Sequence, residues 1–133
     1  MLLFLLPLMV ENYIEISKIQ FEGRLQFETN IDPRSLDKRI PPMIIQILIE
    51  NALKHGVSNL KYGGKVSLAT HVKNDKLIIK VVNSGSLQNT LITTKLGLQN
   101  IIKRLELLFV KDAKFTLKEI ENEVIAIIII PLI

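Results

Sequence analysis

The sequence lacks cysteine, N-glycosylation sequons and long apolar runs. Without cysteine, a disulfide framework and a thiolate metal site are both impossible. The absence of Asn-x-Ser/Thr agrees with a cytosolic setting. The two most apolar runs, residues 1–10 and 124–133, contain Pro7 and Pro131 and are far shorter than the roughly 18 to 20 residues of a spanning helix. The first run also lacks the basic segment and cleavage site of a signal peptide.

Charge and composition favour one folded domain. Lys and Arg outnumber Asp and Glu by 17 to 13, and the net charge of +4 is not gathered in any basic run, so we expect no nucleic-acid binding. With 48% hydrophobic residues the chain is not disordered, and its 133 residues are the size of a single domain. The mean hydropathy of +0.32 indicates that some apolar surface meets another segment or chain.

Hydrophobic periodicity predicts three helices and five strands. The helices are expected over residues 10–21, 41–55 and 97–110, and a flexible polar flap over 84–95. The strands are expected over 24–30, 65–73, 77–82, 113–120 and 124–130, with a loop opening at Asp32-Pro33 and hairpin turns at Asn74-Asp75 and Glu121-Asn122. This order predicts an α+β fold, a two-layer sandwich in which helices cover one face of a mixed five-stranded sheet.

Three segments carry polar residues where ligand chemistry is expected. The second helix is apolar almost all round, yet its last two turns place polar side chains within half of its circumference; this indicates either a ligand site or a helix end emerging into water. The buried strand that ends in Asn83-Ser84-Gly85 is either a site or an ordinary exit into a turn. A helix opening at Gly97 presents N–H groups that can receive phosphate, although a single glycine there is also common. The polar residues of the second helix are Gln46, Glu50, Asn51, Lys54 and His55.

Together and in this order, these segments resemble a known family. IPPMIIQILIENALKHG, VVNSG and KLGLQNIIKRLELLF resemble the ATP-binding domain of LytS-type sensor histidine kinases, in the wider family that includes gyrase and MutL. The resemblance extends from about residue 11 to 133 and implies a Bergerat-type fold whose sheet is mostly antiparallel. It also implies that residues 1–22 are an N-terminal helix left from an upstream dimerisation and phosphoacceptor region, and that residues 23–133 are the ATP-binding catalytic domain.

The resemblance implies ATP and Mg²⁺ as ligands and a role for each matching residue. Asn51 matches the asparagine whose carbonyl oxygen binds Mg²⁺, and Glu50 is the neighbouring carboxylate, which holds metal-bound water or assists proton transfer. Lys54 and His55 lie on the helical face of Asn51 and approach the phosphates, and His55 joins Glu50 as a catalytic residue.

The same resemblance assigns the base and the lid. Asn83 matches the residue that reads the adenine amino group, and Gly85 leaves room for the base. Residues 86–95 correspond to the ATP lid. The residues around the phosphates are Lys95, Gly97, Leu98 and Asn100.

Several residues depart from the family pattern. Asn83 stands where aspartate is more common, and Lys95 stands at the first glycine of the Gly-x-Gly-Leu box. Ile47 occupies the position at which the ATPases of the wider family carry a carboxylate, so ATP hydrolysis is not expected. Neither His55 nor His71 has the sequence context of the phosphoacceptor histidine, which the resemblance places in an upstream segment.

The leading hypothesis is a catalytic domain that transfers the γ-phosphoryl group of ATP to a histidine on that upstream segment, with a response regulator downstream. The resemblance further implies a bacterial, membrane-anchored kinase with this domain on the cytoplasmic side, and we expect a homodimer through residues 2–19. The alternative is a degenerate nucleotide-binding module that serves interaction or regulation without turnover. A gyrase-like ATPase is disfavoured by Ile47.

Overall fold

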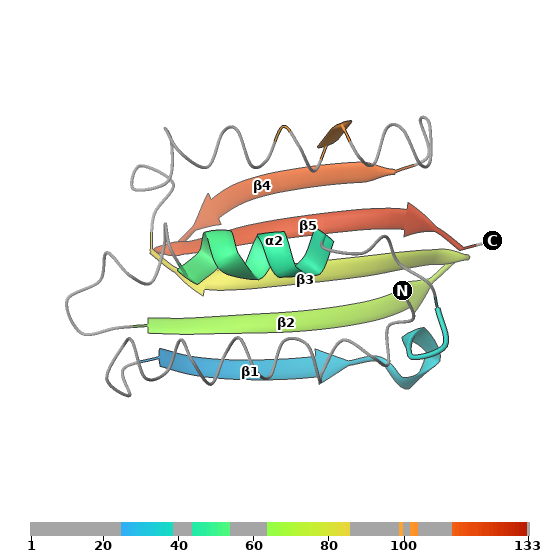
Figure 1. The fold of residues 1–133 in the computed structure, drawn as a ribbon, viewed down its shortest axis with the longest axis horizontal. Helices are drawn as coiled ribbons and strands as arrows, with labels where there is room; N and C mark the ends of the chain where they lie inside the picture. The colour runs from blue at the N-terminus through green and yellow to red at the C-terminus, as the bar shows by residue number, and fades with distance from the viewer. Residues whose placement is uncertain are drawn as a thin grey trace.

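Five strands form one sheet in the part of the chain that the computed structural model describes, which comprises residues 25–38, 44–53, 64–85, 99, 102–103 and 113–132. Their spatial order is β1-β2-β3-β5-β4 (Figure 1). β1 pairs in parallel with β2 and the other three pairings are antiparallel, so the sheet is mixed and mostly antiparallel. The strands are β1 (Leu25–Ile31), β2 (Gly64–Lys73), β3 (Lys76–Ser84), β4 (Lys114–Ile120) and β5 (Glu123–Pro131).

Alternation along the strands gives the sheet two different faces. On β2, Val66 and Leu68 are buried, whereas Ser67 and Ala69 between them are half-buried. β3 is the central strand, as its nearly continuous apolar run predicts. It continues through Ser84, beyond the predicted end at residue 82, because Asn83 and Ser84 still pair with β5. All five strands confirm the sequence prediction within a few residues.

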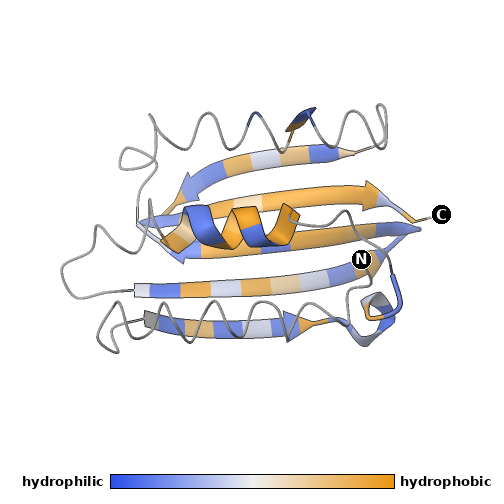
Figure 2. Cartoon of the chain, viewed as in Figure 1, coloured by the Kyte–Doolittle hydropathy of each residue, from blue (hydrophilic) through white to orange (hydrophobic). Residues whose placement is uncertain are grey.

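Helix α2 (Ile44–Asn51) covers one face of the sheet (Figure 1). Its residues Ile44, Ile45, Leu48 and Ile49 recur at the helical spacing, are buried, and pack against core residues of β2, β3 and β5. Figure 2 shows the polar residues of α2 alternating with these apolar ones. The helix predicted over 41–55 is confirmed over its described residues, and both of its predicted ends lie outside them.

The two other predicted helices are mostly outside the described residues. This applies to all of residues 10–21 and, within 97–110, to all but Gln99, Ile102 and Lys103, which are helical. Ile102 is 40% exposed and therefore does not join the core, contrary to its place in the apolar pattern. None of the described helices is long and apolar enough to span a lipid bilayer.

Both hairpins turn through two residues with positive φ. Asn74 and Asp75 have φ of 53° and 60°, and Glu121 and Asn122 have φ of 49° and 64°. Positive φ at both central positions defines a type I′ turn, whose twist matches that of the flanking strands. The predicted turn positions are confirmed, although neither turn contains the glycine that favours this geometry.

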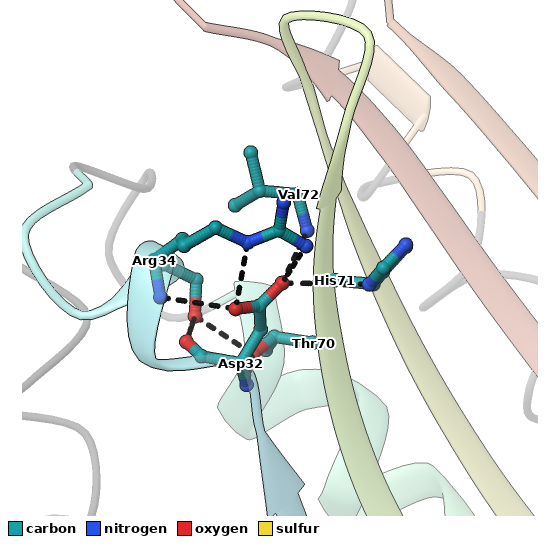
Figure 3. A network of polar contacts seen from close by, with 6 residues as sticks. Asp32, Arg34, Thr70, His71 and Val72 are labelled. Atoms are coloured by element: carbon teal, nitrogen blue, oxygen red, sulfur yellow. Dashed lines mark hydrogen bonds and ion pairs between the residues drawn. The ribbon is translucent and has the colours of Figure 1, made fainter.

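A polar cluster fixes the corner between β1 and β2 (Figure 3). At the predicted loop, Asp32 caps a short 3-10 helix, η2 (Pro33–Ser35), and its carboxylate accepts hydrogen bonds from the backbone N–H groups of Arg34 and Val72 at 3.0 and 2.9 Å. The Arg34 guanidinium donates to both carboxylate oxygens, and His71 Nδ1 lies 3.4 Å from Oδ2. We call Asp32, Arg34, Ser35, Thr70 and His71 the Asp32 cluster.

The Asp32 cluster also contains a buried hydroxyl pair. Ser35 and Thr70 are 0% and 5% exposed, and their hydroxyl oxygens lie 2.8 Å apart. The Arg34 side chain, followed by the backbone bond from Val72, holds the pKa of Asp32 far below its ordinary value of 3.8. The same contact raises the pKa of the Arg34 guanidinium above its ordinary value. The ionised carboxylate therefore joins η2 to β2.

Candidate functional site

The C-terminal ends of α2 and β3 lie at the same end of the sheet (Figure 1). β2 begins at this end and the β4–β5 turn lies there as well, which makes it a junction of four elements. Two hydrogen bonds join β2, the end of β3 and the β4–β5 turn: Lys65 N–H donates to Ser84 Oγ at 3.1 Å, and Gly85 N–H donates to the Asn122 carbonyl oxygen at 2.9 Å. These bonds therefore fix the position of Ser84 and Gly85, the two residues that precede residues 86–95.

Asn51, the last residue of α2, has a buried side-chain nitrogen without a hydrogen-bond partner. Burying a donor in this way costs about 1 to 3 kcal/mol. The helix widens to π-helical geometry directly afterwards, at Ala52 and Leu53, a distortion frequent at functional sites. Glu50 precedes Asn51 and is half-buried. At the end of α2, Asn51 therefore keeps a hydrogen-bond donor that no described residue satisfies.

Asn83 is a polar residue on the face of the sheet that α2 covers. It continues the buried series of Ile79 and Val81, pairs with Val66 and Val124, and is 5% exposed. Its side-chain nitrogen donates to the Ser84 carbonyl oxygen at 2.9 Å. The side-chain oxygen accepts no hydrogen bond from the described residues. Asn83 therefore presents an acceptor.

Gly85 is buried and has a φ of 131°. This region of backbone conformation favours glycine because a Cβ atom clashes there.

The oxygen atoms at the end of α2 fit a hard cation. A carboxamide oxygen at Asn51 and a carboxylate at Glu50 are the ligand types that Mg²⁺ takes in proteins. Among the described residues, no three His, Cys, Asp or Glu side chains gather as a metal site. Asn51 and Glu50 would supply one or two oxygen ligands of such a cation.

The structure thus brings four predicted residues to one end of the sheet, namely Glu50, Asn51, Asn83 and Gly85. Sequence reasoning missed the two residues that fasten this end, Ser84 and Asn122, because their bonds depend on strand register. It also missed the Asp32 cluster, for which Asp-Pro at a helix start was the available signal. The remaining predicted residues, Lys54, His55, Lys95, Gly97, Leu98 and Asn100, lie outside the described residues.

Two sensor proteins are similar to this chain in sequence. The sensor histidine kinase BtsS of Escherichia coli K12 is 31% identical over 104 residues, which cover 77% of this chain and 18% of BtsS. The sensor protein LytS of Staphylococcus saprophyticus is 33% identical over 76 residues, which cover 57% of this chain and 13% of LytS. The chain thus spans less than a fifth of the length of either relative. No protein-family model matches it.

Solved histidine kinase structures share the fold. The catalytic domain of histidine kinase ThkA has a TM-score of 0.62 and 24% identity, covering 92% of this chain and 91% of that one. ThkA has also been crystallised in complex with the response regulator protein TrrA; the ThkA in that structure has a TM-score of 0.60 and 22% identity, covering 92% of this chain and 40% of its own. At these identities the likeness concerns the fold.

Proposed function

Because this chain belongs to the family of histidine kinase catalytic domains, which serve two-component signalling, we propose that it binds ATP with Mg²⁺ and supplies the γ-phosphoryl group to a histidine on another segment of the kinase. The observation that carries the proposal is the buried Asn51 nitrogen without a partner. A bound triphosphate offers acceptor oxygens for this donor.

The Asn51 carboxamide and the Glu50 carboxylate are the described groups that hold the cation in this proposal. The metal supplies charge neutralisation of the phosphate oxygens when it is bound. The Asn51 carboxamide supplies an oxygen to the cation and a nitrogen donor to a phosphate oxygen, and both contacts orient the phosphates. The role of this chain is positioning and charge stabilisation, because the phosphoryl acceptor lies elsewhere. Lys54, His55, Lys95, Gly97, Leu98 and Asn100 complete the phosphate site in this proposal, with His55 beside Glu50 in the catalytic role.

Asn83 reads the base in this proposal. Since its nitrogen already donates to the Ser84 carbonyl, the atom left for a ligand is the oxygen. An oxygen accepts a hydrogen bond from the amino group of adenine and repels the carbonyl oxygen of guanine. The site therefore prefers adenine, even though an amide replaces the more common carboxylate. Gly85 admits the ring beside Asn83.

The larger context is part of the same proposal. The described sheet and helix belong to a Bergerat-type sandwich, with further helices covering the α2 side. Residues 1–22 form a helix from the dimerisation region and mediate homodimerisation, and residues 23–133 are the catalytic domain. A response regulator receives the phosphoryl group, as the pairing of ThkA with TrrA suggests by analogy. The domain lies on the cytoplasmic side of a membrane-anchored kinase.

The test is calorimetric titration of the 133-residue chain with non-hydrolysable analogues of ATP and GTP, with and without Mg²⁺. We expect the ATP analogue to bind at least about tenfold more tightly than the GTP analogue. Asn51→Ala should remove the Mg²⁺ dependence, and Asn83→Ala should weaken ATP binding and reduce the preference over GTP. Asn30→Ala, at an exposed position on β1, is the matched control and should bind as the parent does.

A folded chain that binds no ATP analogue at millimolar concentration contradicts the proposal. The degenerate interaction module then becomes the better interpretation. Substantial Mg²⁺-dependent ATP hydrolysis by the isolated chain would instead favour an ATPase, against the expectation from Ile47, which is half-buried in α2.

A further inference from the structure

The face of the sheet opposite α2 carries a row of apolar side chains. On β5, Ile125, Ile127 and Ile129 alternate with the buried core residues and are half-buried. We call these three residues the isoleucine row. Ile78 and Val82 of β3 pair with two of its members and extend it sideways. Figure 2 shows β5 hydrophobic along most of its length, which means that both of its faces are apolar.

Lysines flank the isoleucine row on both sides. Each isoleucine has one lysine as a cross-strand neighbour: Lys80 on β3, and Lys114 and Lys118 on β4. All three lysines are exposed, and none forms an ion pair with a residue that the structure describes. The Cβ atoms of residues that pair across strands lie about 5 Å apart, so these lysines border the apolar row.

The whole face has an excess of positive charge. Its strand residues include two acidic side chains, Glu28 and Glu123, and Glu28 already pairs with Lys65 at 2.9 Å. A hollow of about 250 Å³ on β1 to β3 is bordered by Lys80, Val82 and Glu28. The lysines of this face are Lys65, Lys73, Lys76, Lys80, Lys114 and Lys118.

We propose that this face docks an acidic amphipathic helix of a protein partner, with its apolar stripe on the isoleucine row and its carboxylates beside Lys80, Lys114 and Lys118. The row spans four residue steps, or about 14 Å, which corresponds to about nine residues of helix. Such a helix presents apolar residues at i, i+3 or i+4, and i+7, and acidic residues on both flanks. The contact leaves the end of α2 free and does not depend on nucleotide binding.

Two other occupants fit the face less well. A second copy docked face to face brings two sets of lysines together, and like charges at an interface oppose association. An anionic membrane surface attracts the lysines, but interfacial binding usually relies on aromatic anchors and on side chains that reach into the acyl boundary. The isoleucine row contains no aromatic residue, and its members are half-buried in a pleated sheet.

The experiment titrates the 133-residue chain with a synthetic two-heptad peptide that has leucine along one face and glutamate on both flanks. A scrambled peptide of the same composition is the control. We expect micromolar binding of the helical peptide, weaker binding at high salt, and methyl chemical-shift changes at the isoleucine row. Lys80→Glu should weaken binding by about fivefold or more, and Ile127→Thr should also weaken it. Lys38→Glu, with the same charge change away from this face, should leave it unchanged.

Four results overturn the proposal. They are equal binding of the scrambled peptide, equal weakening by Lys38→Glu, binding of phosphatidylserine vesicles without binding of the peptide, and a dimer that Lys80→Glu dissociates. The vesicle result assigns the face to lipid and the dimer result assigns it to a second copy. Circular dichroism melts of each variant check that folding is retained. We expect it to be, since Lys80 is exposed, the Lys38 side chain is 35% exposed, and threonine keeps the β-branched shape at residue 127.

Discussion

Asn83 continues a series of buried residues on β3, after Ile79 and Val81. All the other members of this series are apolar. Asn51 similarly ends a helix whose inner residues are isoleucine and leucine. A polar group in such a place is unfavourable unless it is hydrogen-bonded. Each of these asparagines leaves one side-chain polar function without a described partner, the nitrogen of Asn51 and the oxygen of Asn83. At the scale of single residues, the buried Asn51 nitrogen lowers the stability of the free protein, and in the proposed function a bound nucleotide would compensate for this cost.

Asn51→Leu should therefore make the protein more stable and inactive at once. Replacing a buried donor that has no partner with an apolar side chain of similar size should raise the free energy of unfolding by about 1 kcal/mol. The same change removes the proposed ligand for Mg²⁺ and should abolish Mg²⁺-dependent ATP binding. Urea denaturation and calorimetric titration measure the two effects. Asn30→Leu, at an exposed position, should alter neither, and a loss of stability in Asn51→Leu contradicts the assignment.

The Asp32 carboxylate predicts a specific dependence of stability on pH. Its pKa in the folded state lies far below the ordinary value of 3.8, chiefly because Arg34 donates hydrogen bonds to it. The carboxylate therefore stabilises the fold fully above that ordinary value, and this contribution is lost as the pH falls towards the folded pKa. We expect Asp32→Asn to lower the Tm at neutral pH and to reduce the fall in Tm below about pH 4.

Asp37→Asn is the matched control for Asp32→Asn. The Asp37 side chain is 80% exposed and its nearest cation, Lys38, lies 3.7 Å away, so its removal should change the Tm little. If the Tm of the parent and the Tm of Asp32→Asn fall equally as the pH decreases below about 4, the proposed role of the Asp32 cluster is contradicted.

At the scale of the element, three of the four residues in the hairpin turns are Asn or Asp, which tolerate positive φ, and Glu121 is the exception. Glu121 adopts a φ of 49° in the type I′ turn between β4 and β5. This left-handed conformation costs a residue with a Cβ atom roughly 1 to 2 kcal/mol. The cost is smaller for asparagine than for glutamate, because the short asparagine side chain forms a hydrogen bond to the nearby backbone. The Asn122 carbonyl also holds Gly85, so this turn contributes to the candidate site.

Glu121→Asn should stabilise the protein by about 0.5 to 1 kcal/mol, because asparagine tolerates the left-handed conformation that the turn imposes. Equilibrium unfolding in urea measures the change. Glu123→Asn is the matched control, since residue 123 is exposed, belongs to β5 and has no positive φ. Equal effects at both positions would show that charge rather than turn conformation is responsible.

At the scale of the whole molecule, β5 organises both faces of the sheet. Its even-numbered residues Val124, Ala126, Ile128 and Ile130 are buried on the α2 side, and the isoleucine row faces the other way. The strand lies between β3 and β4, so it also joins the last hairpin to the central strand.

Ile128→Ala should be among the most destabilising changes to an aliphatic residue. Ile128 is 0% exposed and pairs with Ile79 and Phe115, so the truncation leaves a cavity in the middle of the sheet and should cost about 2 to 5 kcal/mol. Ile120→Ala, at a position that is 46% exposed, should cost about 0.5 kcal/mol or less. Comparable losses in urea denaturation would contradict the placement of the core.

Much of the fold was predictable because its determinants are local. The alternation of apolar and polar residues predicted all five strands, and the residues typical of turns predicted the positions of both hairpins. The resemblance to sensor kinases also points to Asn51 and Asn83, whose roles in ligand binding stay a prediction. The exposure of Ile102 was not predictable from helical spacing, because that spacing does not say whether a neighbouring element covers the position.

The sequence by itself determined the strands, the described helix and the family, since these depend on short-range patterns and on motifs that survive at low identity. Only the tertiary structure decided which ends of the helix and strands lie next to each other. The insertion of β5 between β3 and β4 depends on pairings between distant residues, and it places the Asn122 carbonyl against Gly85. The orphaned Asn51 nitrogen, the orientation of the Asn83 amide and the lysines beside the isoleucine row follow from that packing, because burial and register exist only once the chain has folded.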